Sequence, residues 1–200
     1  MSLFQEVRVK QLLVLTVLVG VLGATEAQAQ DRGGVRFGYN AATISTDEEG
    51  FDPKVRSGLV VGLFGVVPVN GMFAVQPEFL FSQQGAKVED GSDKATLKID
   101  YVQIPVLGRI RLGASSPAYL LVGPSFGFRT RAESEFNGET QSFKDDVKGN
   151  DVGIVTGVSV YAGMFVVDGR YTWGLMNIDD TDDNAKTKNR VFSISAGIRF

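Results

Sequence analysis

Hydrophobic and polar residues alternate with a period of two along most of the chain after residue 30. The final segment, 190–200, shows this most clearly, with Phe192, Ile194, Ala196, Ile198 and Phe200 on one face and Ser193, Ser195, Gly197 and Arg199 on the other. Successive side chains of a β-strand point to opposite faces. Alternating segments of about ten residues are typical of strands that cross a membrane in a barrel.

The same alternation predicts eight strands. We expect them at 33–43, 58–68, 72–83, 97–112, 117–130, 150–163, 165–175 and 190–200, of which 58–68 is apolar on both faces. An even number of antiparallel strands can close into a barrel, and closure leaves no unpaired strand edge in lipid.

The connections between these strands alternate in length. Short links are expected near 70–71, 114–116 and 163, and long, charge-rich links at 44–57, 84–96, 131–149 and 177–189. Short turns of membrane barrels face the periplasm and long loops face outward. The predicted fold is therefore all-β: an eight-stranded antiparallel transmembrane β-barrel with short periplasmic turns and long extracellular loops.

The first 29 residues have the features of a signal peptide. A weakly basic stretch at 6–10 precedes an apolar run at 12–22, and Ala27-Gln28-Ala29 forms a small-x-small cleavage site. The run is too short to span a bilayer as a helix. We therefore expect a cleaved signal peptide at 1–29 and a barrel domain at 30–200, exported to the cell outer membrane of a Gram-negative envelope. An uncleaved N-terminal anchor is the alternative.

A soluble eight-stranded barrel is the rival architecture, and it would place its apolar face inside. Here one face carries large aliphatic and aromatic residues, whereas the other mixes glycine, serine, glutamine and charged residues. That polar set suits the interior of a narrow barrel, which side chains just fill at eight strands. This distribution favours the membrane barrel.

Six charged residues are predicted to point into the lumen. They are Glu78, Arg109, Arg111, Asp168, Arg170 and Arg199. Buried charges are costly unless they are paired, so we expect a packed charge network. The alternative is a gated or selective pore lined by charge.

The composition narrows the chemistry. The chain has no Cys and no His, which excludes disulfides and metal sites built on thiolate or imidazole. Its net charge of −3 argues against nucleic acid as a partner. A carboxylate pair could hydrolyse glycosides, but the acidic residues lie mainly in the predicted loops without a recognisable pocket. We therefore predict no enzyme activity and no cofactor.

One acidic segment resembles a calcium loop. Asp180, Asp182 and Asn184 have the 1-3-5 spacing of an EF-hand, but Ala185 and Val191 replace the glycine and the glutamate that such a loop needs. A solvated acidic loop is the favoured interpretation, and a weak cation site is the alternative. The mixed charges at 131–149 leave contact with lipopolysaccharide or a partner protein open.

The C-terminal Phe200 ends a strand of alternating apolar residues. Such an ending is similar to the signal by which the barrel-assembly machinery recognises its clients, and we predict that role for Phe200. Outer-membrane lipid and lipopolysaccharide are the further partners expected of an integral barrel.

Several segments, in order, resemble the PorT-like outer-membrane β-barrel family of Bacteroidetes-type bacteria. They are Gly38-Tyr39-Asn40, the segments 75–85, 101–107, 121–127 and 168–175, and Phe200. The resemblance implies an integral outer-membrane barrel, and the family's name-giving member takes part in protein secretion and gliding. The chain departs from the family at Ala41-Ala42-Thr43. We expect a structural, docking or small-ligand-binding protein; the alternatives are an accessory component of a secretion or gliding complex and a narrow passive pore.

Overall fold

The computed structural model describes residues 33–46, 53–90, 93–136, 139–178 and 186–200. The predicted signal peptide, 1–29, lies outside these residues and stays a prediction. The strands are β1 (Gly33–Ser45), β2 (Lys54–Gly65), β3 (Val67–Pro68), β4 (Phe73–Asp90), β5 (Asp93–Arg111), β6 (Ala118–Phe136), β7 (Glu139–Ser142), β8 (Asn150–Ala162), β9 (Phe165–Gly174) and β10 (Lys188–Arg199), with a short 3₁₀ helix, η1 (Lys144–Asp146). No helix in this part of the chain is long and apolar enough to cross a membrane.

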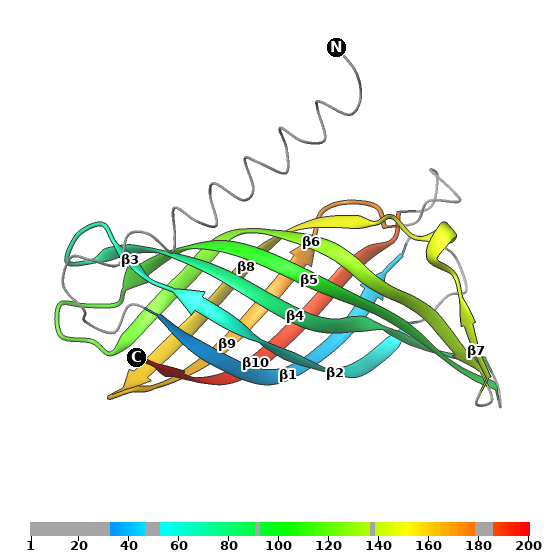
Figure 1. The fold of residues 1–200 in the computed structure, drawn as a ribbon, viewed down its shortest axis with the longest axis horizontal. Helices are drawn as coiled ribbons and strands as arrows, with labels where there is room; N and C mark the ends of the chain where they lie inside the picture. Colours follow the sequence, from blue (N-terminus) through cyan, green and yellow to red (C-terminus); the bar gives the residue numbers. More distant parts are fainter. Residues whose placement is uncertain (1–32, 47–52, 91–92, 137–138, 179–185) are drawn as a thin grey trace, which may run out of the picture. The chain divides into compact units, whose positions relative to one another are not determined.

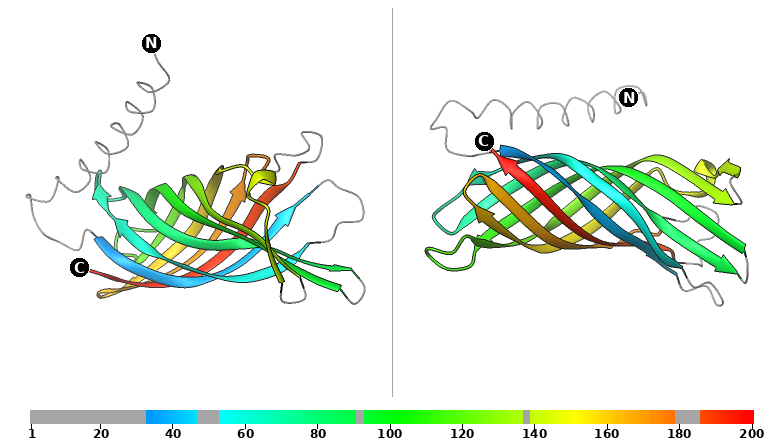
Figure 2. Two further views of the ribbon diagram at one scale, coloured as in Figure 1. Left: turned by 45° about the vertical axis from the view of Figure 1, so that its right-hand side comes forward. Right: turned by 90° about the horizontal axis from the view of Figure 1, so that it is seen from below.

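Eight of these strands form a closed antiparallel barrel (Figure 1). The order around the ring is β2-β1-β10-β9-β8-β6-β5-β4, and pairing of β2 with β4 closes it. The short strands β3 and β7 pair only at the margins, with β4 and β6. The predicted fold is confirmed, and the two views of Figure 2 show the strands tilted around the barrel.

The barrel is apolar outside and polar inside. Along β1, Val35, Phe37 and Tyr39 are exposed, whereas Arg36 and Asn40 between them are buried. The same alternation holds along β10, where Phe192 and Ile194 point outward. Such an outer face is unfavourable in water and suits lipid, because lipid chains replace the contacts of a core.

The part of β2 that follows Ser57 is apolar on both faces, as predicted for 58–68. Leu59, Val61 and Leu63 face outward, and Val60 and Phe64 are buried in the lumen. The buried Phe64 ring meets a charged side chain of the adjacent strand β1. The Arg36 guanidinium lies 4.7 Å from the centre of the Phe64 ring.

The prediction of long loops at 84–96 and 131–149 is wrong in large part. The strands β4, β5 and β6 continue into these segments. Past the barrel they form, with β7, a four-stranded sheet extension: residues 88–90, 93–98, 131–136 and 139–142 (Figure 1). Period-two hydrophobicity marks a strand only where one face is buried or meets lipid. The side chains of β7 are exposed on both faces and most of those at 131–136 are half-buried, so no regular apolar face marks these strands in the sequence.

The transition from barrel to extension depends on two local irregularities. Gly85 in β4 has φ +119°, and a Cβ there would lie 2.1 Å from the Leu97 carbonyl oxygen, so this position requires glycine. Opposite it, the pairing of β5 with β6 shifts register between Asp100 and Tyr101. A bulge of this kind bends a strand and re-aims its side chains.

The extracellular mouth is filled by a small apolar cluster, which we call the extracellular cap. Val147 and Ile178 enter it from the connections after β7 and β9, and Lys148 N donates to the Ile178 carbonyl at 2.8 Å. The six buried residues of the cap are Ile44, Ala86, Ile99, Tyr101, Val147 and Ile178. These connections therefore close the barrel mouth with a hydrophobic core of their own.

Candidate functional site

The centre of the lumen holds a buried carboxylate, Glu78 of β4, with three donors around it. Arg170 of β9 makes a two-pronged contact, with Nη1–Oε2 at 2.7 Å and Nη2–Oε1 at 3.1 Å. Gln76 Nε2 donates to Oε1 at 2.6 Å. Paired geometry of this kind is the strongest that arginine and carboxylate form.

Arg36 and Asp168 complete this group, which we call the central ion-pair cluster. Arg36 Nη1 lies 2.9 Å from Asp168 Oδ2, and Arg36 Nη2 lies 3.4 Å from Glu78 Oε1. Asp168 also meets Arg170 at 3.4 Å and accepts a hydrogen bond from Ser195 Oγ at 3.3 Å. Two arginines and two carboxylates cancel, so the cluster is neutral.

The Glu78–Arg170 contact crosses the lumen. β4 and β9 lie four strands apart in either direction around the ring of eight, so they face each other across the barrel. A bridge between opposite walls ties the barrel together and fills its cross-section. Water has little room to pass at this level.

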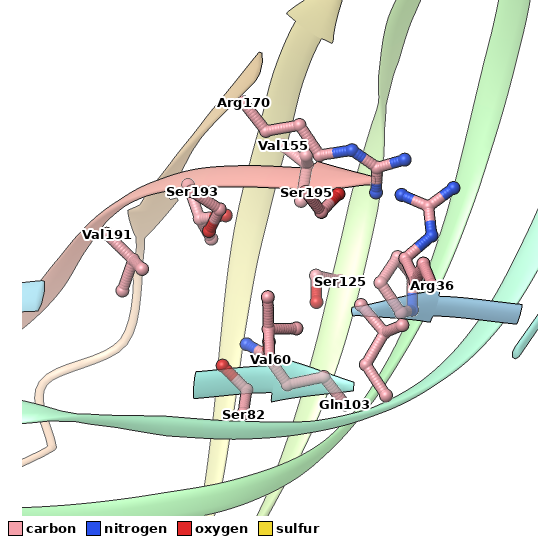
Figure 3. Close-up of a pocket in the computed structure, with 13 residues that line it drawn as sticks. Arg36, Val60, Ser82, Gln103, Ser125, Val155, Arg170, Val191, Ser193 and Ser195 are labelled. Carbon is pink, nitrogen blue, oxygen red and sulfur yellow. The ribbon is translucent and has the colours of Figure 1, made fainter. Parts of the chain in front are cut away.

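Beside this cluster lies a cavity of about 30 Å³, lined by small polar and apolar side chains together with two arginines and a glutamine (Figure 3). Figure 3 shows the guanidinium groups of Arg36 and Arg170 on one side, with Ser82, Ser125 and Ser193 around the rest. A cavity of this size holds a few water molecules. It is too small for an organic ligand.

A second group of arginines lies at the periplasmic end of the barrel. Arg109 is buried between two rings, with its Cζ atom 3.7 Å from the Tyr119 centroid and 4.3 Å from that of Tyr161. Arg111 lies 5.4 Å from the Tyr119 ring and Arg199 lies 5.2 Å from the Tyr161 ring. We call these five residues the arginine–tyrosine cluster.

The six residues predicted to form one lumen network thus divide into two groups. Glu78, Asp168 and Arg170 meet in the central ion-pair cluster, whereas Arg109, Arg111 and Arg199 contact tyrosines at the periplasmic end. Sequence reasoning missed Arg36, although the alternation of 33–43 places it on the inner face. Tyr119 and Tyr161 were missed because an aromatic residue on an inner face resembles ordinary packing.

A third charged group lies at the extracellular end. Arg56 Nη1 is 3.2 Å from Asp100 Oδ1 and also donates to the Gln84 carbonyl oxygen. Arg131 Nη1 lies 3.9 Å from Asp100 Oδ2. Strict alternation puts Asp100 outside, with Val102. Asp100 is nevertheless buried, beside the register shift and in contact with Arg56 and Arg131, and no sequence signal indicated that shift.

The sheet extension carries exposed ion pairs. Arg131 Nη2 lies 2.5 Å from Glu133 Oε2, and this hydrogen bond holds the pKa of the Glu133 carboxyl below its ordinary value. Lys98 donates to Glu135 and lowers the pKa of that carboxyl in the same way. These pairs stand in water, where each contributes little stability.

Two further predicted sites stay predictions. Asp180, Asp182 and Asn184 lie outside the described residues, so the weak cation site stays a prediction. Among the residues that the structure describes, no group of three or more acidic side chains is placed to hold a metal ion. Phe200 is exposed next to the end of β10, and its amide donates to the Gly33 carbonyl at 2.9 Å.

Solved structures with this fold are small outer-membrane barrels. Ail, the attachment invasion locus protein of Yersinia pestis, is 18% identical with a TM-score of 0.52, over 86% of this chain and 100% of Ail. Neisserial surface protein A is 14% identical with a TM-score of 0.55, over 84% of this chain and 97% of that protein. At these identities the likeness shows the fold alone.

The family comparison agrees with the fold. No curated protein matches the chain. The model of a family described as outer membrane protein beta-barrel domain matches residues 28–180. That match covers most of the chain and includes seven of the eight barrel strands. The chain is therefore a small outer-membrane β-barrel protein and belongs to the outer membrane protein beta-barrel domain family.

Proposed function

We propose that this protein is a non-conducting, non-catalytic docking protein, whose extracellular end binds a positively charged partner. The closed lumen is the observation that carries the proposal. The central ion-pair cluster bridges opposite walls, and the cavity beside it has room for only a few water molecules. A barrel closed in this way serves as a membrane anchor for the segments exposed at its two ends.

The two ends differ sharply in charge. The four connections at the extracellular end, 46–53, 91–92, 137–149 and 175–187, contain eleven acidic and three basic residues, a net charge of −8. The three at the periplasmic end, 66–72, 112–117 and 163–164, contain no charged residue. A concentration of one sign of charge steers and favours partners of the opposite sign.

This negative charge indicates a ligand different from that of Ail, which has a similar fold. Ail has been crystallised with the heparin analogue sucrose octasulfate, which is a polyanion. Connections with a net charge of −8 repel such a ligand. The sheet extension, a four-stranded surface outside the barrel, adds room for a protein partner.

The PorT-like resemblance supports a second candidate, an accessory role in a secretion or gliding complex. Both candidates require a protein partner, and they differ in whether that partner belongs to a stable envelope complex. Absence of enzyme activity is part of the proposal because the sequence contains no His or Cys. The common acid–base and nucleophilic constellations depend on those residues.

Single-channel recording tests the closed lumen. The mature protein in a planar bilayer should give no steady conductance at any voltage that the bilayer tolerates. Steps of uniform size from the unaltered protein would establish the narrow pore instead. Protein in the same preparation should migrate as a folded barrel on an unheated gel, so that a flat trace is not due to unfolded material.

Quantitative co-purification tests docking. We would tag the protein, solubilise outer membranes in neutral detergent and compare it with a variant carrying amides at Asp47, Glu48, Glu49 and Asp52. A partner with an exposed basic surface should be lost from the variant and from the unaltered protein at high salt. A matched control exchanges Asp47 and Asp52 for Glu and Glu48 and Glu49 for Asp, which keeps the charge. Equal recovery with all three proteins would contradict the proposal.

Co-purification of the tagged protein with several envelope proteins that stay bound at high salt would favour the accessory role in a secretion or gliding complex. A monomer without any partner would count against both.

A further inference from the structure

Arg109 is a buried cation whose surroundings are aromatic. Its side chain is 6% exposed, and two tyrosine rings enclose the guanidinium at 3.7 and 4.3 Å. The rings themselves meet edge to face, with centroids 5.4 Å apart. Stacking of this kind favours a cation and holds its planar group in one orientation.

The described residues provide Arg109 and Arg111 with no ion pair, unlike the arginines at the barrel centre. Arg36 and Arg170 each contact both Glu78 and Asp168. Arg111 donates instead to the Ala114 carbonyl at 3.3 Å, and its Nε atom, like that of Arg109, is buried without an acceptor among the described residues. Buried positive charge without a counter-charge is costly, and a bound anion would remove that cost.

A third donor lies in the same cluster. The Tyr161 hydroxyl oxygen is buried and has no hydrogen-bond partner among the described residues. Buried polar groups are nearly always hydrogen-bonded, so an unpartnered one needs an explanation. A ligand oxygen at this end of the lumen would provide one.

The cluster lies where a periplasmic ligand could reach it. Arg111 is the last residue of β5, next to the short turn 112–117, and Tyr161 is one residue from the end of β8. Arg111 and Arg199 are only half-buried, whereas Arg109 lies deeper. The positive charge therefore begins at the mouth and continues inward.

We propose that the periplasmic mouth of the barrel binds an oxyanion, a phosphate or carboxylate, through Arg109 and Arg111 with Tyr161 as an additional donor. Arginine suits this task because its fork of N–H groups matches the two oxygens of such a group. The site is separate from the extracellular docking surface, because the central ion-pair cluster lies between them.

Binding of inorganic phosphate to the whole mature protein in neutral detergent tests the site. We would follow thermal unfolding while phosphate replaces chloride at constant ionic strength. Phosphate should raise the unfolding temperature in a saturable manner, because a ligand of the folded state alone stabilises it. Absence of a phosphate-specific rise would overturn the proposal.

Three variants identify the residues. Arg111→Gln and Tyr161→Phe should each weaken the apparent phosphate affinity, Arg111→Gln by about tenfold. Arg129→Gln is the matched control: Arg129 is also half-buried with an unpartnered Nε and donates to the Lys144 carbonyl at 2.7 Å, but it lies at the extracellular end. Equal weakening by Arg129→Gln would mean a general charge effect and would overturn the assignment.

Two further experiments distinguish a free anion from a lipid headgroup as the ligand. In the first, acetate replaces phosphate, and stabilisation by both would indicate a free carboxylate or phosphate ligand. In the second, the protein is reconstituted into phosphatidylcholine vesicles with and without phosphatidylglycerol, in buffer without phosphate. A rise that occurs only with phosphatidylglycerol and is lost in Arg111→Gln would identify a lipid headgroup as the ligand.

Discussion

The barrel centre and the sheet extension contain ion pairs of the same chemistry in opposite surroundings. At the centre, Glu78 is 4% exposed and two arginines approach it from other strands. In the extension, Glu133 pairs with Arg131 of the same strand, two residues away, in contact with water. The central pair of Glu78 and Arg170 joins opposite walls of the barrel, whereas the outer pairs lie within β6 or between the adjacent strands β5 and β6.

This difference determines what each group of charges can do. Loss of one partner at the centre leaves a charge buried and unpaired, which costs about 3–5 kcal/mol. Loss of one partner in the extension leaves a charge that water solvates. The central cluster therefore holds the barrel closed, and the charges of the extension are free to change without loss of the fold.

The largest effect is expected from Glu78→Gln. The variant leaves Arg36 and Arg170 with Asp168 alone, and we expect a loss of about 3–5 kcal/mol in the free energy of unfolding. Urea-induced unfolding in lipid vesicles, followed by tryptophan fluorescence from Trp173, would measure it. Glu133→Gln serves as the control and should change the same free energy much less.

A double variant sharpens this comparison. Replacement of Glu78 by Leu together with Arg170 by Met removes both charges of the bridge, and an apolar pair of similar volume is often neutral or stabilising. Asp168 and Arg36 then remain as one pair. If Glu78→Gln alone costs no more than Glu133→Gln, the central cluster does not hold the barrel together.

A smaller effect is expected from Ile178→Ala in the extracellular cap. Ile178 is 2% exposed, and its backbone hydrogen bonds to Lys148 and Thr187 do not depend on its side chain. The cavity left behind should cost about 2–3 kcal/mol, the lower part of the range for such substitutions.

Two measurements would check this prediction. Hydrogen exchange of the Lys148 amide should report faster opening of the mouth, and urea unfolding should report the loss of stability. Ile194→Ala, on the lipid face of β10, is the matched control and should cost less. Equal losses would mean that the cap does not pack as a core.

The smallest effect is expected from acid in the sheet extension. Hydrogen bonds from Arg131 and Lys98 lower the pKa values of Glu133 and Glu135 from their ordinary value of 4.5 in the folded state. Their contribution to stability is therefore complete above pH 4.5 and is lost as the pH falls through the lowered pKa values. High salt should weaken it further.

Carbon-13 NMR of the two side-chain carboxyl groups would follow this titration. Arg131→Gln should move the Glu133 midpoint upward, and Lys98→Gln should do the same for Glu135. Midpoints that do not move in these variants would contradict the ion pairs of the extension.

The comparison also shows why some strands could be predicted and others could not. Alternation correctly indicated β8, β9 and β10 to within about two residues. It failed beyond Gln83 and Thr130, where β4 and β6 run past the predicted strand ends through the extracellular cap and into the sheet extension without a regular apolar face. Asp100 shows the same limit, since it lies beside a register shift and is buried although alternation places it outside.

The sequence by itself determined the number of barrel strands, the apolar outer face and the polar inner face. Lipid on one side of every strand imposes that pattern locally, residue by residue. Only the tertiary structure decided which inward charges meet. Glu78 and Arg170 are 92 residues apart, and ring closure places their strands opposite each other.

The same closure left Arg109 between two tyrosines and Arg111 beside one of them, instead of beside carboxylates. Side-chain pairing across a lumen depends on strand order, stagger and bulges, which are properties of the closed ring and are absent from any single strand.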